Sequence, residues 1–144
     1  MQESQVHKVG FVLVSTENEQ RAVMLVKSGP GKWRFPSADL PVALTYCDKE
    51  SAEDFRAELN LGRSTYVNNV FFRDAREAGK VARFYALKCA APDVALANVA
   101  EAMGVQTRWA SFEEAYWVVA AEHLEIAQWA ERLVVPKKEE TLKS

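Results

Sequence analysis

The chain has 144 residues, of which 49% are hydrophobic, so it is long enough for one compact core and too short for two ordinary domains. Its 18 Lys and Arg nearly balance its 20 Asp and Glu, and the formal net charge of −2 gives no global field that would attract duplex nucleic acid or an anionic membrane. We therefore expect neither a nucleic-acid nor a membrane partner, and any anionic ligand must be held by local charges.

The chain carries none of the usual signs of export or of a cysteine-based site. Residues 1–8 lack the basic start and apolar run of a secretory signal, and no apolar stretch is long enough to span a bilayer. Cys47 and Cys89 are too few and too far apart for a disulfide framework or a zinc site. His7 and His123 have no nucleophile beside them, so we assign neither a catalytic role. These features predict a cytoplasmic protein with two free thiols.

The N-terminal part of the chain predicts a β-hairpin. Val9–Ser15 is a continuous apolar run rich in valine, and Ala22–Val26 is a second such run after the polar residues 16–20. Valine-rich runs of this length favour pleated structure. Ser28–Lys32 is a turn by composition, since glycine supplies positive φ and proline fixes φ. It leads into a predicted short strand, Trp33–Phe35.

An acidic helix is predicted over Glu50–Leu61. It follows a segment, Pro36–Lys49, that we expect to be irregular, and Asp48 is the candidate N-cap residue. Asn60 and Gly62 suit the C-terminus of the helix. Its apolar stripe, which should face a core, consists of Ala52, Phe55 and Leu59.

The second half of the chain predicts another hairpin, which is followed by two helices and a strand. Aromatic and β-branched residues in Thr65–Arg73 and Lys80–Cys89 indicate two strands around the polar loop Asp74–Gly79. The remaining predicted elements, in chain order, are a short helix over Asp93–Met103, a strand over Val105–Ala110 and a helix from Ser111 to about Val134. We expect one domain over residues 1–135 and a charged, disordered tail over 136–144.

Three carboxylates recur at every fourth position of the acidic helix, so Glu50, Asp54 and Glu58 lie on one face. Such a stack destabilises the helix unless water screens it or a cation bridges it, and carboxylate oxygens with a few waters are what Mg²⁺ accepts. The spacing therefore suggests a site for Mg²⁺ or Mn²⁺ on Asp54 and Glu58, with Glu50 as an outer ligand. The same spacing also fits an ordinary solvent-facing acidic surface, and Glu50 also suits a helix N-terminus, where the dipole favours a carboxylate.

Basic and aromatic residues near the glycine-containing turn could bind a nucleotide. Lys27 and Arg34 flank this turn, and an Arg side chain can contact a phosphate with two hydrogen bonds. Ordinary surface charge is the alternative for both. Trp33 could stack on a nucleobase, although aromatic residues on strands more often belong to the core.

Two arginines, Arg73 and Arg83, are predicted on adjacent strands of the second hairpin. If they point inward they line a pocket, where Arg73 is a further candidate for phosphate binding. If they do not, they pair with Asp74 and Glu77. The sequence leaves both possibilities open.

The order of these elements resembles the Nudix hydrolase superfamily over roughly Val9–Leu133. Lys32–Pro36 (KWRFP) resembles the strand that leads into the family's signature loop. More specifically, Thr107–Ala115 (TRWASFEEA) resembles the Arg-Trp, small-residue, Glu-Glu-Ala entry to the last helix. The resemblance implies an α/β (α+β) fold, a Nudix-like α/β/α sandwich with a mixed central sheet, with the Glu50–Leu61 helix on one side and the C-terminal helix on the other.

The signature itself is degenerate. With Leu61 as its closing apolar residue, the chain keeps an acidic group at two positions, Asp54 and Glu58. The residues that depart from the signature are Glu53 (for arginine), Ala57 (for a metal-binding glutamate), Asn60 (for glycine), Asp39 (for the loop glycine) and Thr45 (for the loop glutamate). A shifted register with Arg56 at the arginine position retains fewer carboxylates and puts Leu59 at a metal position, so we prefer the first register.

The resemblance implies a pyrophosphohydrolase that hydrolyses a nucleoside diphosphate linked to another moiety. In that reading Asp54 and Glu58 hold Mg²⁺ or Mn²⁺, and Lys27, Arg34 or Arg73 steadies the phosphates. The lost residues predict slow turnover and weak or absent metal binding. They equally fit a catalytically inactive Nudix-fold module that binds a nucleotide or another protein. RNA-end binding gains little from the balanced charge. Many family members form homodimers, so the resemblance also implies a possible homodimer.

Overall fold

The fold is organised around one long apolar strand, β1 (Val6–Ser15), in the middle of a mixed sheet. The computed structural model describes residues 6–15, 21–44, 49–67 and 72–134, and places side chains in all of these except 41–44 and 49. Strand β1 pairs antiparallel with β2 and β3 and parallel with β6. The other strands are β2 (Ala22–Lys27), β3 (Ser37–Leu44), β4 (Thr65–Tyr66), β5 (Arg73–Glu77), β6 (Lys80–Lys88) and β7 (Gln106–Ser111).

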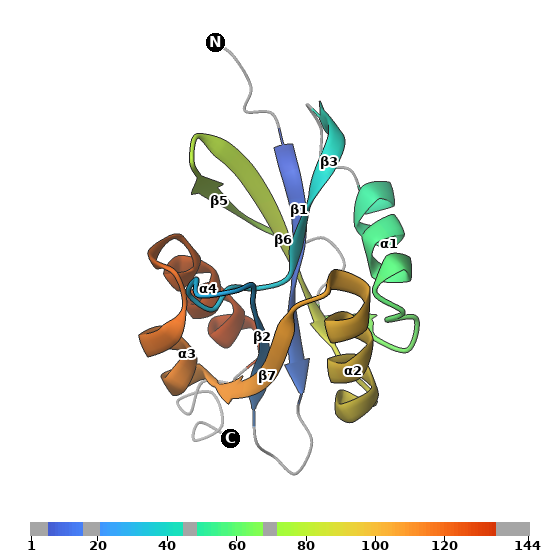
Figure 1. The fold of residues 1–144 in the computed structure, drawn as a ribbon, viewed down its shortest axis with the longest axis vertical. Helices are drawn as coiled ribbons and strands as arrows, with labels where there is room; N and C mark the ends of the chain where they lie inside the picture. Colours follow the sequence, from blue (N-terminus) through green and yellow to red (C-terminus); the bar gives the residue numbers. More distant parts are fainter. Residues whose placement is uncertain (1–5, 16–20, 45–48, 68–71, 135–144) are drawn as a thin grey trace, which may run out of the picture.

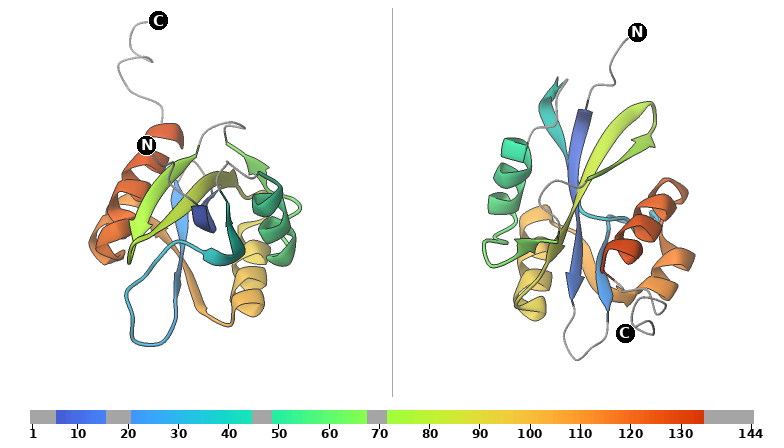
Figure 2. Two further views of the ribbon diagram at one scale, coloured as in Figure 1. Left: turned by 90° about the horizontal axis from the view of Figure 1, so that it is seen from above. Right: turned by 180° about the vertical axis from the view of Figure 1, so that it is seen from behind.

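Helices cover both faces of this sheet, whose main strand order is β4-β6-β1-β2-β7 (Figures 1 and 2). The elements on one face are the helices α1 (Lys49–Glu58) and α2 (Pro92–Met103). Those on the other are α3 (Phe112–Val118), the short 3₁₀ helix η2 (Ala121–His123) and α4 (Leu124–Val134). This arrangement confirms the α/β/α sandwich and the placement of the acidic and C-terminal helices on opposite sides.

The two cores follow from the alternation of side chains along β1. Phe11 and Leu13 point into the core beneath α1 and α2, whereas Val12 and Val14 point into the core beneath α3 and α4. All four side chains are fully buried, as expected for a central strand that is covered on both faces. The continuous apolar run in the sequence thus reflects burial on two sides.

The first hairpin is confirmed, but two predictions in the segment after it are wrong. Trp33–Phe35 is not a strand, because the structure has only single bridges there, from Arg34 to Val26 and from Trp33 to Val119. The segment expected to be irregular contains β3. Its Pro41 suggested an interruption, yet the β1–β3 register shifts between Val6 and Lys8, and such irregularities are where strands tolerate proline.

The second hairpin forms farther along the chain than predicted. Strand β4 lies at the beginning of the first predicted strand, whose residues 68–71 lie outside the described ranges, while β5 occupies most of the expected loop Asp74–Gly79. The turn is confined to Ala78 and Gly79, which both have positive φ, as tight hairpin turns require. Strand β5 is highly charged, and only its alternation marks it as a strand, since Ala75 and Glu77 are buried while their neighbours are more exposed.

The predicted C-terminal helix is divided. Ser111 caps α3 by accepting a hydrogen bond from the Glu114 backbone N–H, as expected. After Val118 the chain is extended, because Val119 bridges to Trp33 and the Ala120 N–H donates to the Trp33 carbonyl at 2.9 Å. This pairing interrupts the helix before η2 and α4.

The remaining helix and strand predictions are close to the observed bounds. Helix α1 buries its predicted stripe of Ala52, Phe55 and Leu59, and Asn60 lies in the left-handed region (φ 57°) just beyond its end. Gly104 ends α2 in the same conformation, and β7 follows. Asp48, Thr45, Cys47 and the predicted tail 136–144 lie outside the described residues. No helix in the described part of the chain is long and apolar enough to cross a membrane.

Candidate functional site

The predicted acidic pair lines a small pocket between α1 and the β1–β3 pair. Asp54 and Glu58 are exposed side chains one helical turn apart, and both border this pocket of about 140 Å³. We call it the Asp54–Glu58 pocket. Its other lining residues are Val9, Ala38, Asp39, Leu40, Ser51 and Phe55. The apolar residues of this lining belong to, or pack against, the core beneath α1 and α2; they are Val9, Ala38, Leu40 and Phe55. The acidic pair therefore borders a concave surface.

This pocket offers few side chains that could bind a metal ion. Asp39, on β3, contributes a third carboxylate to the lining. Glu50 is exposed in the first turn of α1 but does not line the pocket. Across residues 6–15, 21–44, 49–67 and 72–134, no three His, Cys, Asp or Glu side chains lie close enough together to form a metal site. Two carboxylates completed by waters and ligand phosphates are nevertheless a usual set for Mg²⁺, so Asp54 and Glu58 fit a weak, water-rich site.

None of the predicted basic residues lines this pocket. The Lys27 ammonium lies 5.8 Å from the Trp33 ring centroid, and the Arg108 guanidinium lies 5.4 Å from it. Trp33 is partly buried and packs against the core beneath α3 and α4. Its ring is therefore already in contact with cations of the chain itself.

The two hairpin arginines make ion pairs that differ in strength. Arg83 donates two hydrogen bonds to Asp74, at 2.7 and 2.8 Å, and lies 3.8 Å from the Phe72 ring centroid. Arg73 reaches Glu125 on α4 at 3.6 Å, in a pair that is open to solvent. Pairing with Asp74 is thus confirmed for Arg83, whereas Arg73 pairs with Glu125. These contacts favour a structural role for both.

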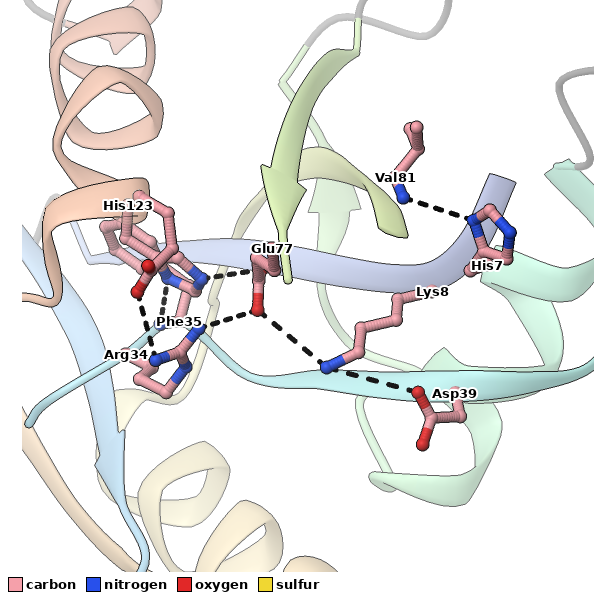
Figure 3. A network of polar contacts seen from close by, with 9 residues as sticks. His7, Lys8, Arg34, Phe35, Asp39, Glu77, Val81 and His123 are labelled. Atoms are coloured by element: carbon pink, nitrogen blue, oxygen red, sulfur yellow. Dashed lines mark hydrogen bonds and ion pairs between the residues drawn. The ribbon is translucent and has the colours of Figure 1, made fainter. Parts of the chain in front are cut away.

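Glu77 belongs instead to a buried polar network that the sequence did not reveal (Figure 3). Its Oε1 accepts a hydrogen bond from Arg34 Nη2 at 2.6 Å, and its Oε2 lies 2.8 Å from His123 Nε2. Arg34 also donates to Glu122 at 3.2 Å. The network joins β5, η2 and the segment between β2 and β3. Glu77 was predicted in a loop and His123 without a role, and only the alternation in β5 could have hinted at the burial of Glu77.

The hydrogen bonds of this network fix its protonation pattern. The Phe35 backbone N–H donates to His123 Nδ1 at 3.0 Å, so the proton of the ring lies on Nε2, which donates to Glu77. Burial alone would raise the pKa of Glu77, but hydrogen bonds from His123 and Arg34, together with nearby positive charge, lower it to about 2. A carboxylate held this way is a poor general base at neutral pH.

A second, polar cavity of about 360 Å³ lies in front of this network, and we call it the Glu77 hollow. Its lining residues are Lys8, Arg34, Asp39, Glu77, Ala78, Lys80 and Glu122. Asp39 borders both this hollow and the Asp54–Glu58 pocket, so the two cavities adjoin. Figure 3 shows the Lys8 side chain between Glu77 and Asp39, and its ammonium lies 3.8 and 4.0 Å from their carboxylate oxygens.

Glu53, which the sequence predicts at the signature's arginine position, has two structural partners, Arg56 and Tyr66. Glu53 receives two hydrogen bonds from Arg56, at 2.9 and 3.1 Å, and one from the Tyr66 hydroxyl. Arg56 additionally donates to the Ser64 carbonyl at 2.7 Å. Burial and the adjacent Glu53 carboxylate raise the pKa of Tyr66 well above its usual range. The cluster ties α1 to β4, so Glu53 holds the helix in place.

Comparison with known proteins identifies the fold. No protein-family profile and no curated protein matches the sequence. Among solved structures, the Ap4A hydrolase of C. elegans in a binary complex is 17% identical, with a TM-score of 0.64 over 88% of this chain and 97% of that one. The Nudix domain of Shewanella oneidensis NrtR, complexed with ADP ribose, is 17% identical, with a TM-score of 0.53 over 92% of this chain and 90% of that one. This chain has the Nudix fold. At such identities the likeness shows the fold alone.

Proposed function

We propose that this Nudix-fold chain is a pyrophosphohydrolase that acts slowly on a nucleoside diphosphate linked to another moiety. The observation that carries the proposal is that Asp54 and Glu58, the two acidic positions kept from the signature, line one pocket and face β3. Two proteins of similar fold support a nucleotide derivative as the substrate. One is named an Ap4A hydrolase, and the other is a Nudix domain complexed with ADP ribose.

The acidic pair would hold Mg²⁺ or Mn²⁺, as expected from the sequence, with Asp39 as a further acceptor at the edge of the pocket. When bound there, a divalent cation supplies Lewis acidity toward the diphosphate. Arg34 is the best placed of the predicted phosphate contacts, because it borders the cavity that adjoins this pocket. Lys27 and Arg73 stay weaker candidates, since each is engaged at another part of the surface.

A second candidate function is an inactive Nudix-fold module that binds a nucleotide or a protein. One specific observation favours it: within the described ranges no three metal-binding side chains lie close enough together for a metal site. Ala57, which replaces a metal-binding glutamate, is exposed on α1 and supplies no further ligand. The cytoplasmic location, the homodimer and the single domain over residues 1–135 likewise remain proposals.

A cleavage assay separates the two candidates. The full chain is incubated with a panel of nucleoside diphosphate derivatives in Mg²⁺ or Mn²⁺, and product nucleotide is measured. Hydrolysis by the wild type should fall about tenfold or more in Asp54→Asn and Glu58→Gln, because each change removes a charged ligand. Glu101→Gln, an exposed glutamate on α2, is the matched control and should retain the rate.

Turnover that persists undiminished in both variants would overturn the metal assignment. If no derivative is cleaved but one of them still raises the thermal stability of the chain, the binding module is the correct function.

A further inference from the structure

Strand β7 lies at the end of the sheet, where it pairs with β2 on one side (Figure 1). No strand of the described residues pairs with its other side. Its six residues match β2 one to one from Gln106 to Ser111, without a bulge. A regular edge strand presents a row of backbone N–H and C=O groups that another strand can bind. The outer side of β7 therefore has the hydrogen-bonding groups for an added strand.

The other strands that pair on one side only are each protected against such an addition. Strand β3 contains Pro41 and pairs with β1 through a register shift, β4 has two residues, and β5 (RDARE) is charged at four of its five positions. Proline, irregular register, shortness and charge are common means of blocking an edge. Strand β7 (QTRWAS) has no proline, no lysine and a single charge. Among the edge strands of the described chain, β7 is thus the one that remains fit for pairing.

The hydrogen bonds of β2 show which groups of β7 face outward. Val26 exchanges both of its backbone hydrogen bonds with Arg34, at 2.8 Å each, so its N–H and C=O point away from β7. Thr107 lies opposite Val26, and in an antiparallel pair of this kind both residues direct their N–H and C=O away from each other. Because the pattern alternates along the strand, the backbone groups of Thr107 and Trp109 face the free edge.

One face of this edge is basic. Arg108 pairs with Leu25, which belongs to the core beneath α3 and α4, so Arg108 lies on that face of the sheet. Trp33 packs against the same core, and its ring centroid is 5.4 Å from the Arg108 guanidinium and 5.8 Å from the Lys27 ammonium. Arg108 pairs with Glu114, whereas Lys27 forms no ion pair with the described residues. This face therefore favours acidic side chains on an added strand.

The opposite face of the edge is apolar. Trp109 is partly buried against the core beneath α1 and α2, and its Nε1 donates to the Pro92 carbonyl at 3.2 Å. Leu96 and Val105 also pack against this core and are partly buried. Side chains of a strand alternate between the two faces of a sheet. The residues of an added strand that lie on this face should therefore be apolar.

From the open edge and its two faces we propose that β7 binds an extended segment of a partner protein as an added strand. Acidic residues of that segment lie on the face of Arg108, and apolar residues alternate with them on the face of Trp109. A second copy of β7 fits less well, because it would bring another arginine and no carboxylate. Main-chain hydrogen bonds supply the affinity of such a complex, and the side chains supply its specificity. The proposal does not depend on nucleotide hydrolysis.

Fluorescence anisotropy with labelled synthetic peptides tests this proposal on the full chain. The probe is TVEVEVT, in which glutamate alternates with valine, and TVKVKVT is the comparison peptide. The chain should bind the glutamate peptide saturably and the lysine peptide about fivefold or more weakly, because two cations lie on one face of the edge. The net charge of −2 would by itself favour the lysine peptide. The double variant Lys27→Gln, Arg108→Gln should lose the preference for the glutamate peptide.

Position 107 supplies a matched pair of variants. Thr107→Pro removes an N–H that faces the free edge and no hydrogen bond to β2, a place where edge strands tolerate proline, so it should abolish peptide binding. Thr107→Val loses the hydrogen bond from the threonine hydroxyl to the Leu96 carbonyl, as the proline variant does, but keeps the N–H. It should bind the glutamate peptide like the wild type. If Thr107→Pro does not fold in chemical denaturation, the double variant decides.

Three results would overturn the proposal: no binding of the glutamate peptide, equal binding of the two peptides by the wild type, or binding that persists in folded Thr107→Pro. Sedimentation velocity tests the other occupant of the edge. A wild-type dimer that dissociates in Thr107→Pro but not in Thr107→Val would assign the edge to a second copy, and the partner segment would then be wrong. None of these measurements involves cleavage, so they leave the proposed function to its own assay.

Discussion

Glu77 shows how a charged side chain can be nearly buried in a small domain. Only 5% of the residue is exposed, and both carboxylate oxygens are bound, one by Arg34 and the other by His123. Removing one partner of such a buried pair strongly destabilises the fold, because it leaves the other charge buried without compensation. The network therefore fixes how η2 and the segment before β3 lie against β5.

The lowered pKa of Glu77 predicts a loss of stability in acid. Because its pKa is about 2 in the folded state and near its ordinary value of about 4.5 when unfolded, its contribution is complete above about pH 5 and falls as the pH approaches 2. Urea unfolding between pH 6 and pH 3 should show this loss, up to about 2–3 kcal/mol. Glu77→Gln should be less stable at pH 6 and should lose less on acidification.

Glu101→Gln serves as the control for this measurement, because Glu101 is exposed and its replacement should leave the acid loss unchanged. A Glu77→Gln chain whose stability falls with pH as steeply as that of the wild type would show that other carboxylates cause the loss.

At this scale the sequence predicts acidic pairs on one helix and misses contacts between distant segments. Asp54 and Glu58 are four positions apart, so helical spacing alone places them on the same face. Glu77 and His123 are 46 positions apart, and their contact depends on the hairpin turn and on the break before η2. Local spacing carries no information about such a pair.

Apolar strands can be predicted from composition, whereas a charged strand that forms only through pairing with its neighbour cannot. Strands β1, β2 and β6 follow from their valine-rich or aromatic runs. Strand β5 has the composition RDARE and forms because it pairs with β6 across a tight turn. Where composition does not predict a strand, pairing with a neighbouring strand determines whether the strand forms.

Gly10 in β1 has no room for a side chain, so the sheet should be sensitive to a substitution there. A Cβ atom added there would clash with the ring of Phe84 and lie 2.8 Å from the Pro36 carbonyl oxygen. Phe84 is fully buried and the carbonyl belongs to the backbone, so neither can move freely. Gly10→Ala should therefore destabilise the chain by about 1–3 kcal/mol, measured by chemical denaturation.

Gly62→Ala is the matched control, because a Cβ atom there would meet nothing within 4 Å. Equal stability of the two variants would mean that β1 and its neighbours can separate at Gly10 without cost, contrary to the packing described.

For the whole molecule, the resemblance in the sequence and the three-layer fold agree. The sheet with helices on both faces was predictable because burial on both faces of β1 leaves a continuous apolar run. The site was predictable only in part. The acidic pair lines one pocket, whereas none of the predicted basic residues lines it, and Arg34 borders the adjoining hollow together with Lys8 and Lys80.

We propose that Asp54 and Glu58 together bind a divalent cation at the pocket between α1 and β3. Titration of the full chain with Mn²⁺, followed by electron paramagnetic resonance of the free ion, measures this directly and does not depend on any substrate. We expect one weak Mn²⁺ site in the wild type and in Glu101→Gln, with affinity about tenfold or more lower in the double variant Asp54→Asn, Glu58→Gln. Equal Mn²⁺ affinity in the wild type and the double variant, or no binding in either, would contradict the claim.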